Sequence, residues 1–536
     1  MIYINRFFFN IHDQLRKFYL NTKIYDIKIS KVNNNNISYK PSPYLLSSIL
    51  DYQKKKSKIE DFSLDEIWLK NNLNDKEFKN LNNFFWFFNL DLKSSKNKVQ
   101  SLISEWIENN RKYDKRSWDF DITSKRIISW LSCHNLTYEN SDKKYQDNFN
   151  YIIQKQTNHL IYEINRSKKL INKLIGCSAI VLVGLCYQNE KKYLSYGIDI
   201  LKKITKSELD SFFFPKSRNF KDLLLYLKYF ILIREWFKEA QINIPEHIEE
   251  IIYNLGQGYA FFGKNINSNF LFNGNNKILI NDFENYLKRF GYNFKNEIID
   301  FGGYIILKNK KISLAMDTGA SPNLKFSKDY QAGVLSFEII SNGKKLISNC
   351  GYYNKKSSNL NRISKSTATQ STLVINDNSS CKFYKYGNFW LVKKGVKILK
   401  RENVFKKDYW KIRASHDGYL KDYNSIHERN IEFHAEKMAF FGVDKIIKKK
   451  IISAYKFDIR FHVEPGVRLM KTQDNKTILI ELKDEGWKFT CNDYKISINN
   501  GLYFGKKNSY TQNQNIFISG ITNNQNENIV WQLSKI

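Results

Sequence analysis

Residues 329–377, DYQAGVLSFEIISNGKKLISNCGYYNKKSSNLNRISKSTATQSTLVIND, decide the fold. Two short runs rich in β-forming residues, 334–341 and 344–350, are joined by the dipeptide Asn342-Gly343. Asn-Gly is the strongest short-range signal for a two-residue hairpin turn, because both central residues of that turn have a positive φ. We therefore expect a β-hairpin here, followed by a polar loop and a further strand.

The rest of the C-terminal half shares this strand pattern. Beyond about residue 265, β-prone runs recur in segments such as GGYIILKNKKISLAMD (302–317) and FDIRFHVEPGVRLM (457–470). Turn dipeptides punctuate this half, among them Asp417-Gly418 and Pro465-Gly466. A period of two together with frequent turns predicts a large antiparallel β-sandwich.

The segment before residue 265 has helical periodicity instead. In NKVQSLISEWIENN (97–110), the apolar residues fall on one stripe of a helix. Similar segments follow one another without a repeat of fixed period, which favours an α/α toroid over a simple solenoid. Residues 1–58 are polar and predict an irregular N-terminal arm. We thus expect a multidomain α+β protein with an arm at 1–58, an α/α toroid at 59–265 and an antiparallel β-sandwich at 266–536.

The chain is strongly basic. Its 86 Lys and Arg residues against 53 Asp and Glu give a formal net charge of +33. Such a charge suits a polyanionic partner such as an acidic glycan, a nucleic acid or an anionic membrane. AT-rich codon usage produces the same excess of Lys, together with abundant Asn, Ile, Tyr and Phe, so both explanations stay open. Six cysteines without a C-x-x-C pair exclude a zinc ribbon and predict free buried thiols.

From about residue 80 to the C-terminus, the order of the segments and the 329–377 stretch resemble the heparinase II/III-like family of polysaccharide lyases. In the helical half, WDFDITSKRIISWL (118–131) is similar to a Trp-containing segment of that family, with Trp118, Arg126 and Trp130 at the matching positions. A guanidinium beside an indole suits an acidic sugar, because the cation pairs with the carboxylate while the ring stacks on the pyranose. The resemblance therefore implies that these three residues bind substrate. The alternative is that Arg126 and Trp130 pack inside the helical domain.

The resemblance also implies a β-elimination reaction at a uronic acid, bound in the groove between toroid and sandwich. A base, His or Tyr, removes the proton beside the carboxylate, and an acid, often Tyr, protonates the leaving glycosidic oxygen. A third group, Asn, Arg or His, neutralises the carboxylate so that the carbanion-like state is reachable.

The helical half departs from this family pattern at two places. Where an Asn-His pair is expected, LINKL (170–174) provides Asn172 and Lys173 but no His. Where a Tyr is expected, FFFPKSRNFKDL (212–223) provides Phe220. Arg126, Asn172 and Lys173 are therefore the candidates in this half for contacting the uronate during catalysis.

The sheet half departs from the pattern as well. A His-x-His-x-Asp signature should fall on DYQAG, where Asp329, Gln331 and Gly333 occupy the three positions. Tyr330 is the only phenol in this loop, and it is the candidate for proton transfer.

A metal site of the family is replaced by amides. Relatives often hold a metal ion with the second His of that signature, an Asp and a later His, and the matching residues here are Gln331, Asn349 and Gln370. Neutral amides are poor zinc ligands, so we expect no metal and no other cofactor, but a cluster of hydrogen-bonded amides instead.

Taken together, the sequence predicts a lyase-type protein that acts on acidic, uronate-containing polysaccharide by β-elimination, with catalysis altered or lost. The first alternative is a non-catalytic protein that binds acidic glycan on the same scaffold. A less favoured alternative is a non-specific nucleic-acid binder driven by charge. No signal peptide or membrane span is recognisable, which predicts a cytoplasmic location by default, whereas the family resemblance points to the periplasm or cell envelope.

Overall fold

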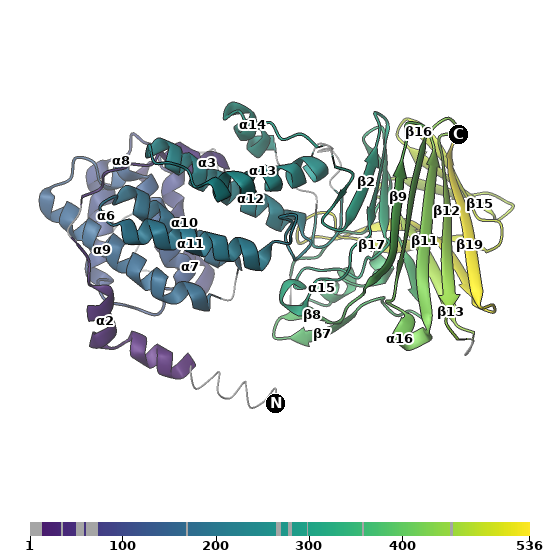
Figure 1. The fold of residues 1–536 in the computed structure, drawn as a ribbon, viewed down its shortest axis with the longest axis horizontal. Helices are drawn as coiled ribbons and strands as arrows, with labels where there is room; N and C mark the ends of the chain where they lie inside the picture. Colours follow the sequence, from purple (N-terminus) through teal and green to yellow (C-terminus); the bar gives the residue numbers. More distant parts are fainter. Residues whose placement is uncertain are drawn as a thin grey trace. The chain divides into compact units, whose positions relative to one another are not determined.

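The computed structural model describes residues 13–33, 36–49, 58–59, 73–167, 170–263, 270–276, 281–296, 298–355, 358–450 and 454–536. The chain forms two compact units. The first comprises Met1–Ser207, Tyr226–Ile252 and Asn281–Asn293, and its described part is helical. The second comprises Glu208–Leu225, Tyr253–Ile280 and Phe294–Ile536, and it carries the sheets (Figure 1). The predicted fold, an α/α toroid followed by an antiparallel β-sandwich, is confirmed.

The helical region consists of amphipathic helices around one apolar helix, α10. The helices from α5 onward are α5 (Asp75–Asn82), α6 (Lys96–Asn109), α7 (Phe120–Ser132), α8 (His134–Thr137), α9 (Lys143–Glu163), α10 (Leu170–Cys186), α11 (Lys191–Glu208), α12 (Phe220–Glu239), α13 (Glu246–Gly263) and α14 (Asn281–Arg289). Residues 174–186 of α10 are all buried. Gly184 allows α11 to approach α10, because a Cβ there would lie 2.4 Å from the backbone nitrogen of Leu194. Among the helices that the structure describes, none is both long enough and apolar enough to span a membrane.

The N-terminal segment differs from the irregular arm that the sequence predicts. It contains helices α2 (Lys23–Ile29) and α3 (Pro43–Ile49). Tyr25 of α2 is fully buried, and its hydroxyl lies 2.6 Å from Nδ1 of His159 on α9. Part of this segment therefore packs on the toroid, because its apolar residues find a buried surface there. The predicted boundary at 265/266 lies outside the described residues, and the domain boundaries stay predictions.

In its described part, the second unit contains four antiparallel sheets. One has eight strands in the order β14-β15-β16-β19-β12-β11-β10-β9, one has four in the order β17-β18-β13-β6, one has β1 to β5, and β7 pairs with β8. The bounds are β1 (Asp300–Phe301), β2 (Tyr304–Lys308), β3 (Ile312–Asp317), β4 (Phe337–Ser341), β5 (Lys344–Ile347), β6 (Leu373–Ile375), β7 (Lys382–Tyr386), β8 (Phe389–Lys394), β9 (Ile398–Phe405), β10 (Tyr409–His416), β11 (Ser425–His434), β12 (Ala439–Lys448), β13 (Lys456–His462), β14 (Arg468–Lys471), β15 (Thr477–Leu482), β16 (Glu485–Thr490), β17 (Ile496–Tyr503), β18 (Thr511–Ile521) and β19 (Asn526–Lys535).

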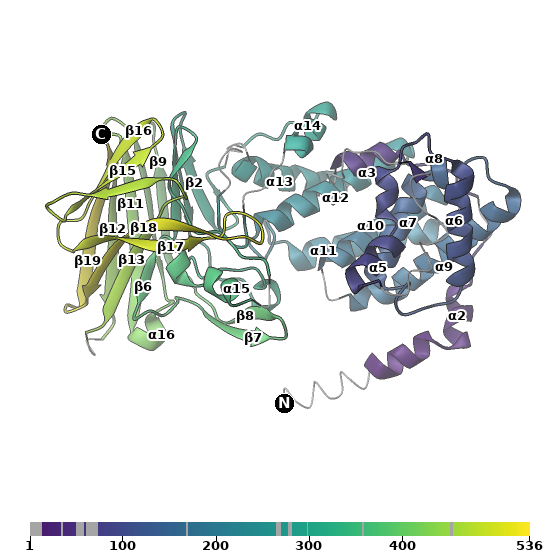
Figure 2. The same cartoon turned by 180° about the vertical axis from the view of Figure 1, so that it is seen from behind.

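Side chains from the first three of these sheets form one continuous core. Figure 2 shows the strands of the four-stranded sheet crossing in front of the eight-stranded sheet. Between them, Phe461 of β13 packs edge-on against Trp531 of β19, with ring centroids 5.0 Å apart. Gly442 of β12 lies under the same indole, where a Cβ would come within 2.0 Å of the ring. The core is thus close-packed around a few large aromatic side chains.

The hairpin predicted from 329–377 is present. Strands β4 and β5 pair antiparallel through Asn342 and Gly343, whose φ angles are 44° and 76°. Both values lie in the left-handed region that the Asn-Gly dipeptide favours. The first strand starts at Phe337 rather than at 334, because Leu335 has a φ of 61° and its N–H donates to the Asp317 carbonyl across the preceding loop.

Candidate functional site

Lys221, in the first turn of α12, is the centre of a polar cluster in the second unit. Its backbone N–H donates to Oδ1 of Asn219, 2.8 Å away, which fixes the start of the helix. Its Nζ donates to the carbonyl oxygen of Gly274 and to Oδ1 of Asn276, each at 2.7 Å. Burial lowers the pKa of Lys221 to about 8, although the nearby Asp329 carboxylate opposes this effect. A lysine with this pKa exists in both protonation states near neutral pH.

Asp222, the next residue, is shifted in the complementary sense. Burial raises its pKa to about 6, and the charge of Asp329 adds to this effect, whereas a hydrogen bond from Ser217 and the charges of Lys328 and Lys221 lower it. The Ser217 hydroxyl donates to Oδ2 of Asp222 at 2.6 Å. Two consecutive ionisable side chains are therefore both pushed toward their neutral forms, which is typical of functional sites.

Asp329 faces this helix start from the loop between β3 and β4. Its Oδ1 accepts a hydrogen bond from the Tyr352 hydroxyl at 2.9 Å. Burial raises the pKa of Tyr352, and the Asp329 carboxylate raises it further, so this phenol stays protonated. We refer to Lys221, Asp222, Asn276, Asp329 and Tyr352 as the Lys221 cluster.

Gly274 brings the parts of the cluster together. It has a φ of 81°, and a Cβ there would lie 3.0 Å from the carbonyl oxygen of Asp329 and 2.6 Å from Nδ2 of Asn219. Its N–H donates to Oε1 of Gln331 at 3.0 Å. Only glycine combines this backbone conformation with such a close approach to both neighbours. The dipeptide Asn273-Gly274 was visible in the sequence, but its role depends on contacts far apart along the chain.

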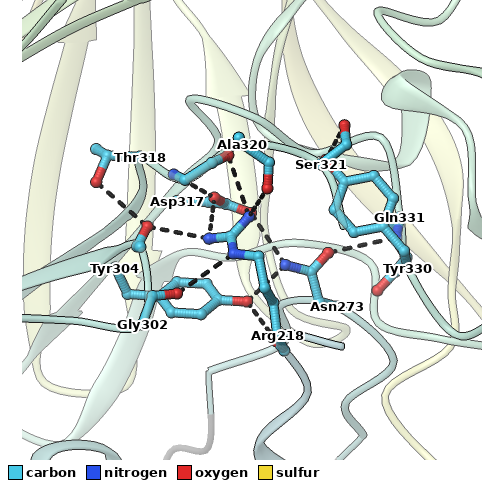
Figure 3. A network of polar contacts seen from close by, with 12 residues as sticks. Arg218, Asn273, Gly302, Tyr304, Asp317, Thr318, Ala320, Ser321, Tyr330 and Gln331 are labelled. Carbon is cyan, nitrogen blue, oxygen red and sulfur yellow. Dashed lines mark hydrogen bonds and ion pairs between the residues drawn. The ribbon is translucent and has the colours of Figure 1, made fainter. Parts of the chain in front are cut away.

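The residue before this helix start is anchored by an extensive network of hydrogen bonds (Figure 3). The Arg218 guanidinium forms an ion pair with Asp317 at 2.7 Å, and it lies 4.6 Å from the Tyr304 ring. It also donates to four backbone carbonyl oxygens, those of Gly302, Gly303, Gly319 and Ala320, at 3.0–3.3 Å. Arg218 thereby fixes residues 219–222 to the sheet of β1 to β5 and positions Lys221.

Comparisons with known proteins agree with this architecture. Residues 299–532 match the family model for the heparinase II/III-like C-terminal domain. The C-terminal part of the chain thus carries a heparinase II/III-like domain.

Solved structures and one curated protein sequence are also similar to it. A heparinase III structure matches with a TM-score of 0.67 and 15% identity over 96% of this chain and 88% of that chain. The heparan sulfate lyase HepC from Pedobacter heparinus matches with a TM-score of 0.69 and 12% identity over 95% and 85% of the two chains. At such identities these structures establish the fold alone. The protein Ycf2 of Physcomitrium patens is 23% identical over 347 residues, a match that covers 60% of this chain but only 14% of that protein.

The predicted substrate-binding residues of the toroid lie in the interior. Arg126 is fully buried, donates to the carbonyl oxygens of Asn82 and Ser117 at 2.9 and 3.0 Å, and stacks on Trp106 at 3.9 Å. Burial lowers the pKa of Arg126. Trp118 and Trp130 are buried as well. In this structure the alternative reading holds: Arg126 and Trp130 pack inside the helical domain, and the structure offers no surface on which the three residues could contact a sugar.

The remaining predicted catalytic residues are not brought together by a described contact. Asn172 and Lys173 lie in the first turn of α10 and are partly exposed. Tyr330 is fully buried in the sandwich core, where its hydroxyl accepts a hydrogen bond from Ser321 at 3.1 Å (Figure 3). Burial raises the pKa of Tyr330. Its place beside Asp329 is taken by Tyr352, which the sequence pattern did not single out.

The three amides at the metal positions of relatives do not form the predicted amide cluster. Gln331 donates to the carbonyl oxygens of Gly351 and Ser364, and Gln370 donates to Thr369. Asn349 donates to Oε1 of Glu338 at 3.2 Å and accepts from the Ser371 N–H at 2.8 Å. That prediction is wrong, because each of the three amides hydrogen-bonds to other groups and the recorded hydrogen bonds join no two of them. In the described part of the chain, no three His, Cys, Asp or Glu side chains are grouped as metal ligands would be.

A second buried set of ionisable groups links β10, β11 and β12. His416 Nδ1 accepts from the Gly418 N–H, so its proton is on Nε2 and is donated to Nδ1 of His427 at 3.2 Å. His427 in turn donates from Nε2 to Oδ1 of Asp444 at 2.7 Å. Both carboxylate oxygens of Asp444 also accept hydrogen bonds from the Arg429 guanidinium. Burial lowers the pKa of both histidines. These groups are inaccessible, and they hold the eight-stranded sheet together rather than contact a substrate.

Proposed function

We propose that this protein acts on an acidic, uronate-containing polysaccharide by β-elimination, with Lys221 as the base. The observation that carries the proposal is the placement of Lys221, a partly exposed lysine whose Nζ is held at 2.7 Å by the Gly274 carbonyl oxygen and by Asn276 beside Asp329. Burial lowers its pKa to about 8, in agreement with this role. A general base is most effective when its pKa is near the working pH. Lys221 follows Phe220, the residue at the position where relatives carry a Tyr, and it faces Asp329, at the position of their catalytic His.

The hydrogen bonds of Lys221 suit its neutral form. A neutral amine has two N–H groups and one lone pair, and the two N–H groups are used by the carbonyl oxygen of Gly274 and by Asn276. The lone pair is left to accept the proton beside the uronate carboxylate. Proton transfer to Lys221 then creates an ammonium group close to Asp329, and this ion pair stabilises the carbanion-like state.

The charges around the cluster favour an anionic substrate. Lys507 and Lys328 are close enough to change the pKa values of Lys221 and Asp222, respectively. Both lysine side chains can pair with the uronate carboxylate and so neutralise it. Asp222, whose pKa of about 6 leaves a protonated fraction at neutral pH, is the group that we assign to protonate the leaving oxygen.

The second candidate is a non-catalytic protein that binds acidic glycan. The observation in its favour is Asp329 itself, because a carboxylate stands where the family resemblance implies the catalytic His. In that case Lys221 serves only as a cation.

A variant series separates the two candidates. Wild type, Lys221→Met and the control Lys325→Met are incubated with polygalacturonate, alginate, hyaluronan and heparan sulfate while the ultraviolet absorbance of unsaturated products is followed. Lys325 is an exposed lysine of the same unit that pairs with Glu208 and lies outside the cluster. We expect turnover with a bell-shaped pH dependence and a maximum near about pH 7, between the pKa of Asp222 and that of Lys221. Turnover should fall at least about a hundredfold in Lys221→Met and stay unchanged in Lys325→Met. Full turnover in Lys221→Met would exclude Lys221 as the base. Binding without product in the wild type would select the second candidate.

A further inference from the structure

A cavity in the sandwich unit lies between helix α15 (Asn359–Ser364) and the β7–β8 hairpin, apart from the residues of the Lys221 cluster. Figures 1 and 2 both show α15 beside this hairpin. The cavity has a volume of about 600 Å³, which is in the usual range for a small-molecule site. We refer to it as the α15 cavity.

The lining of the α15 cavity is basic and aromatic. It includes Arg362, Lys382 and Lys393, the rings of Phe383 and Trp390, and no carboxylate. Lys382 is paired with Asp422 at 3.0 Å. Arg362 and Lys393 are exposed and have no carboxylate partner among the residues that the structure describes. Two cations without a counter-charge are therefore available to an anion that enters the cavity.

The aromatic rings specify the kind of anion further. Trp390 is partly exposed, and the Arg362 guanidinium lies 5.6 Å from its ring. An indole offers a flat apolar face to the C–H groups of a pyranose, while a guanidinium binds a carboxylate or sulfate through two parallel hydrogen bonds. This combination fits a sugar that carries an acidic group better than it fits a free anion.

The hairpin that lines the cavity is also bonded to the loop that carries Asp329. The Nζ of Lys365 donates to the carbonyl oxygens of Lys328 and Trp390, at 2.6 and 2.8 Å. The N–H of Val392 donates to the Ser327 hydroxyl at 3.0 Å. Residues on both sides of the cavity and the residue before Asp329 thus belong to one hydrogen-bonded assembly.

We infer that the α15 cavity binds a carboxylate- or sulfate-bearing sugar unit, with Trp390 as the stacking surface and with Arg362 and Lys393 as the anion-binding groups. The assignment of this sugar unit to the same polymer that reaches Lys221 rests on the proposed function. The binding itself does not, because it requires none of the residues of the Lys221 cluster.

Calorimetric titration of the full chain tests the inference. The probes are a galacturonate hexamer, which carries carboxylates only, a heparin-derived hexasaccharide, which also carries sulfates, and neutral maltohexaose. The variant Arg362→Gln/Lys393→Gln removes two charges from the cavity, and the control Lys310→Gln/Lys311→Gln removes two exposed charges from the β2–β3 turn. Because all four substituted residues are exposed, we expect both of these double variants to fold.

We expect at least one anionic probe to bind at least about tenfold more weakly to the cavity variant, and Trp390→Leu to weaken it similarly. The control should change the affinity by less than about twofold, since exposed charges outside the site act only through screened long-range fields. Turnover of the same probes is followed in parallel, so that absence of turnover and absence of this site are distinguishable: a loss of affinity in the cavity variant supports the inference whether or not the wild type forms product. Equal losses in cavity variant and control would overturn the inference. So would equal affinity for maltohexaose, no binding of either anionic probe, or tighter binding of a thymidine dodecamer, which would indicate a nucleic-acid site.

Discussion

Replacing Arg218 by methionine removes a buried cation from the network that fixes the start of α12. The side chain is 9% exposed and that of its partner, Asp317, is 1% exposed. After the substitution Asp317 keeps only the N–H groups of Asn273 and Gly319, each at 3.1 Å, and four backbone carbonyl oxygens lose a donor. Loss of one partner from a buried ion pair destabilises a protein by about 3–5 kcal/mol. We therefore expect the second unit of Arg218→Met to be about 4 kcal/mol less stable than the wild type.

Arg401→Met is the matched control. Arg401 also pairs with an aspartate of this unit, Asp300, and donates to the Thr318 hydroxyl. The side chains of Arg401 and Asp300 are 30% and 35% exposed, respectively. Such solvent-exposed pairs contribute about 0–1 kcal/mol. The comparison therefore isolates the effect of burial at constant side-chain chemistry.

Hydrogen exchange is the appropriate assay, because the chain has two compact units and a single unfolding transition is not expected. Peptides from β2 and β3 report the opening of the unit that contains the network. A decrease of about 4 kcal/mol in the free energy of opening makes amide exchange faster by a factor of about a thousand. In Arg401→Met the increase should stay below about tenfold. If the two variants exchange at rates within tenfold of each other, the Arg218 network does not anchor this segment as we argue.

Three further predictions concern the sandwich core and the metal positions. Gly442→Ala places a methyl group against the Trp531 indole and should lower the stability by about 1–3 kcal/mol in chemical denaturation; an unchanged midpoint would show that the indole can move aside. Because burial lowers the pKa of His427, the unfolded chain binds more protons than the folded chain below about pH 6.5, so stability falls as the pH decreases. Denaturation midpoints between pH 5 and pH 7 should therefore depend less on pH in His427→Gln than in the wild type, and an equal dependence would contradict this. Addition of zinc or a chelator should shift the melting temperature by less than about 1 °C, whereas a stoichiometric zinc-dependent rise would contradict the absence of a zinc site.

Local signals in the sequence predicted the fold well, because they depend on a few adjacent residues. The Asn342-Gly343 turn requires only its own two φ angles, and the structure has both. The helical and β segments were recognisable from their periods for the same reason. The depth of a side chain is a different property. Spacing placed Arg126 and Trp130 on one helix face, but whether that face meets solvent or another helix is decided by packing, and here both are buried.

The site was harder to predict because its members come from four separate segments. Tyr330 and Tyr352 both belong to the 329–377 stretch, yet only Tyr352 bonds to Asp329, whereas Tyr330 turns into the core. The available signal was a charged pair, Lys221 and Asp222, between Phe220 and the apolar run that begins at Leu223. Its meaning depends on burial, which shifts both pKa values, and burial is set by the fold rather than by neighbouring residues.

The two largest departures from the family pattern are physically connected. A carboxylate at position 329, where the family resemblance implies an imidazole, is favoured by a cation nearby. Lys221 provides that cation, and the Gly274 backbone and the Arg218 network hold it in place. Under the proposed function, the basic group has moved from the sandwich loop to the start of α12, and the loop now supplies the counter-charge. The missing histidines are then evidence of an exchange of roles between two facing segments, and they do not by themselves indicate a loss of proton transfer.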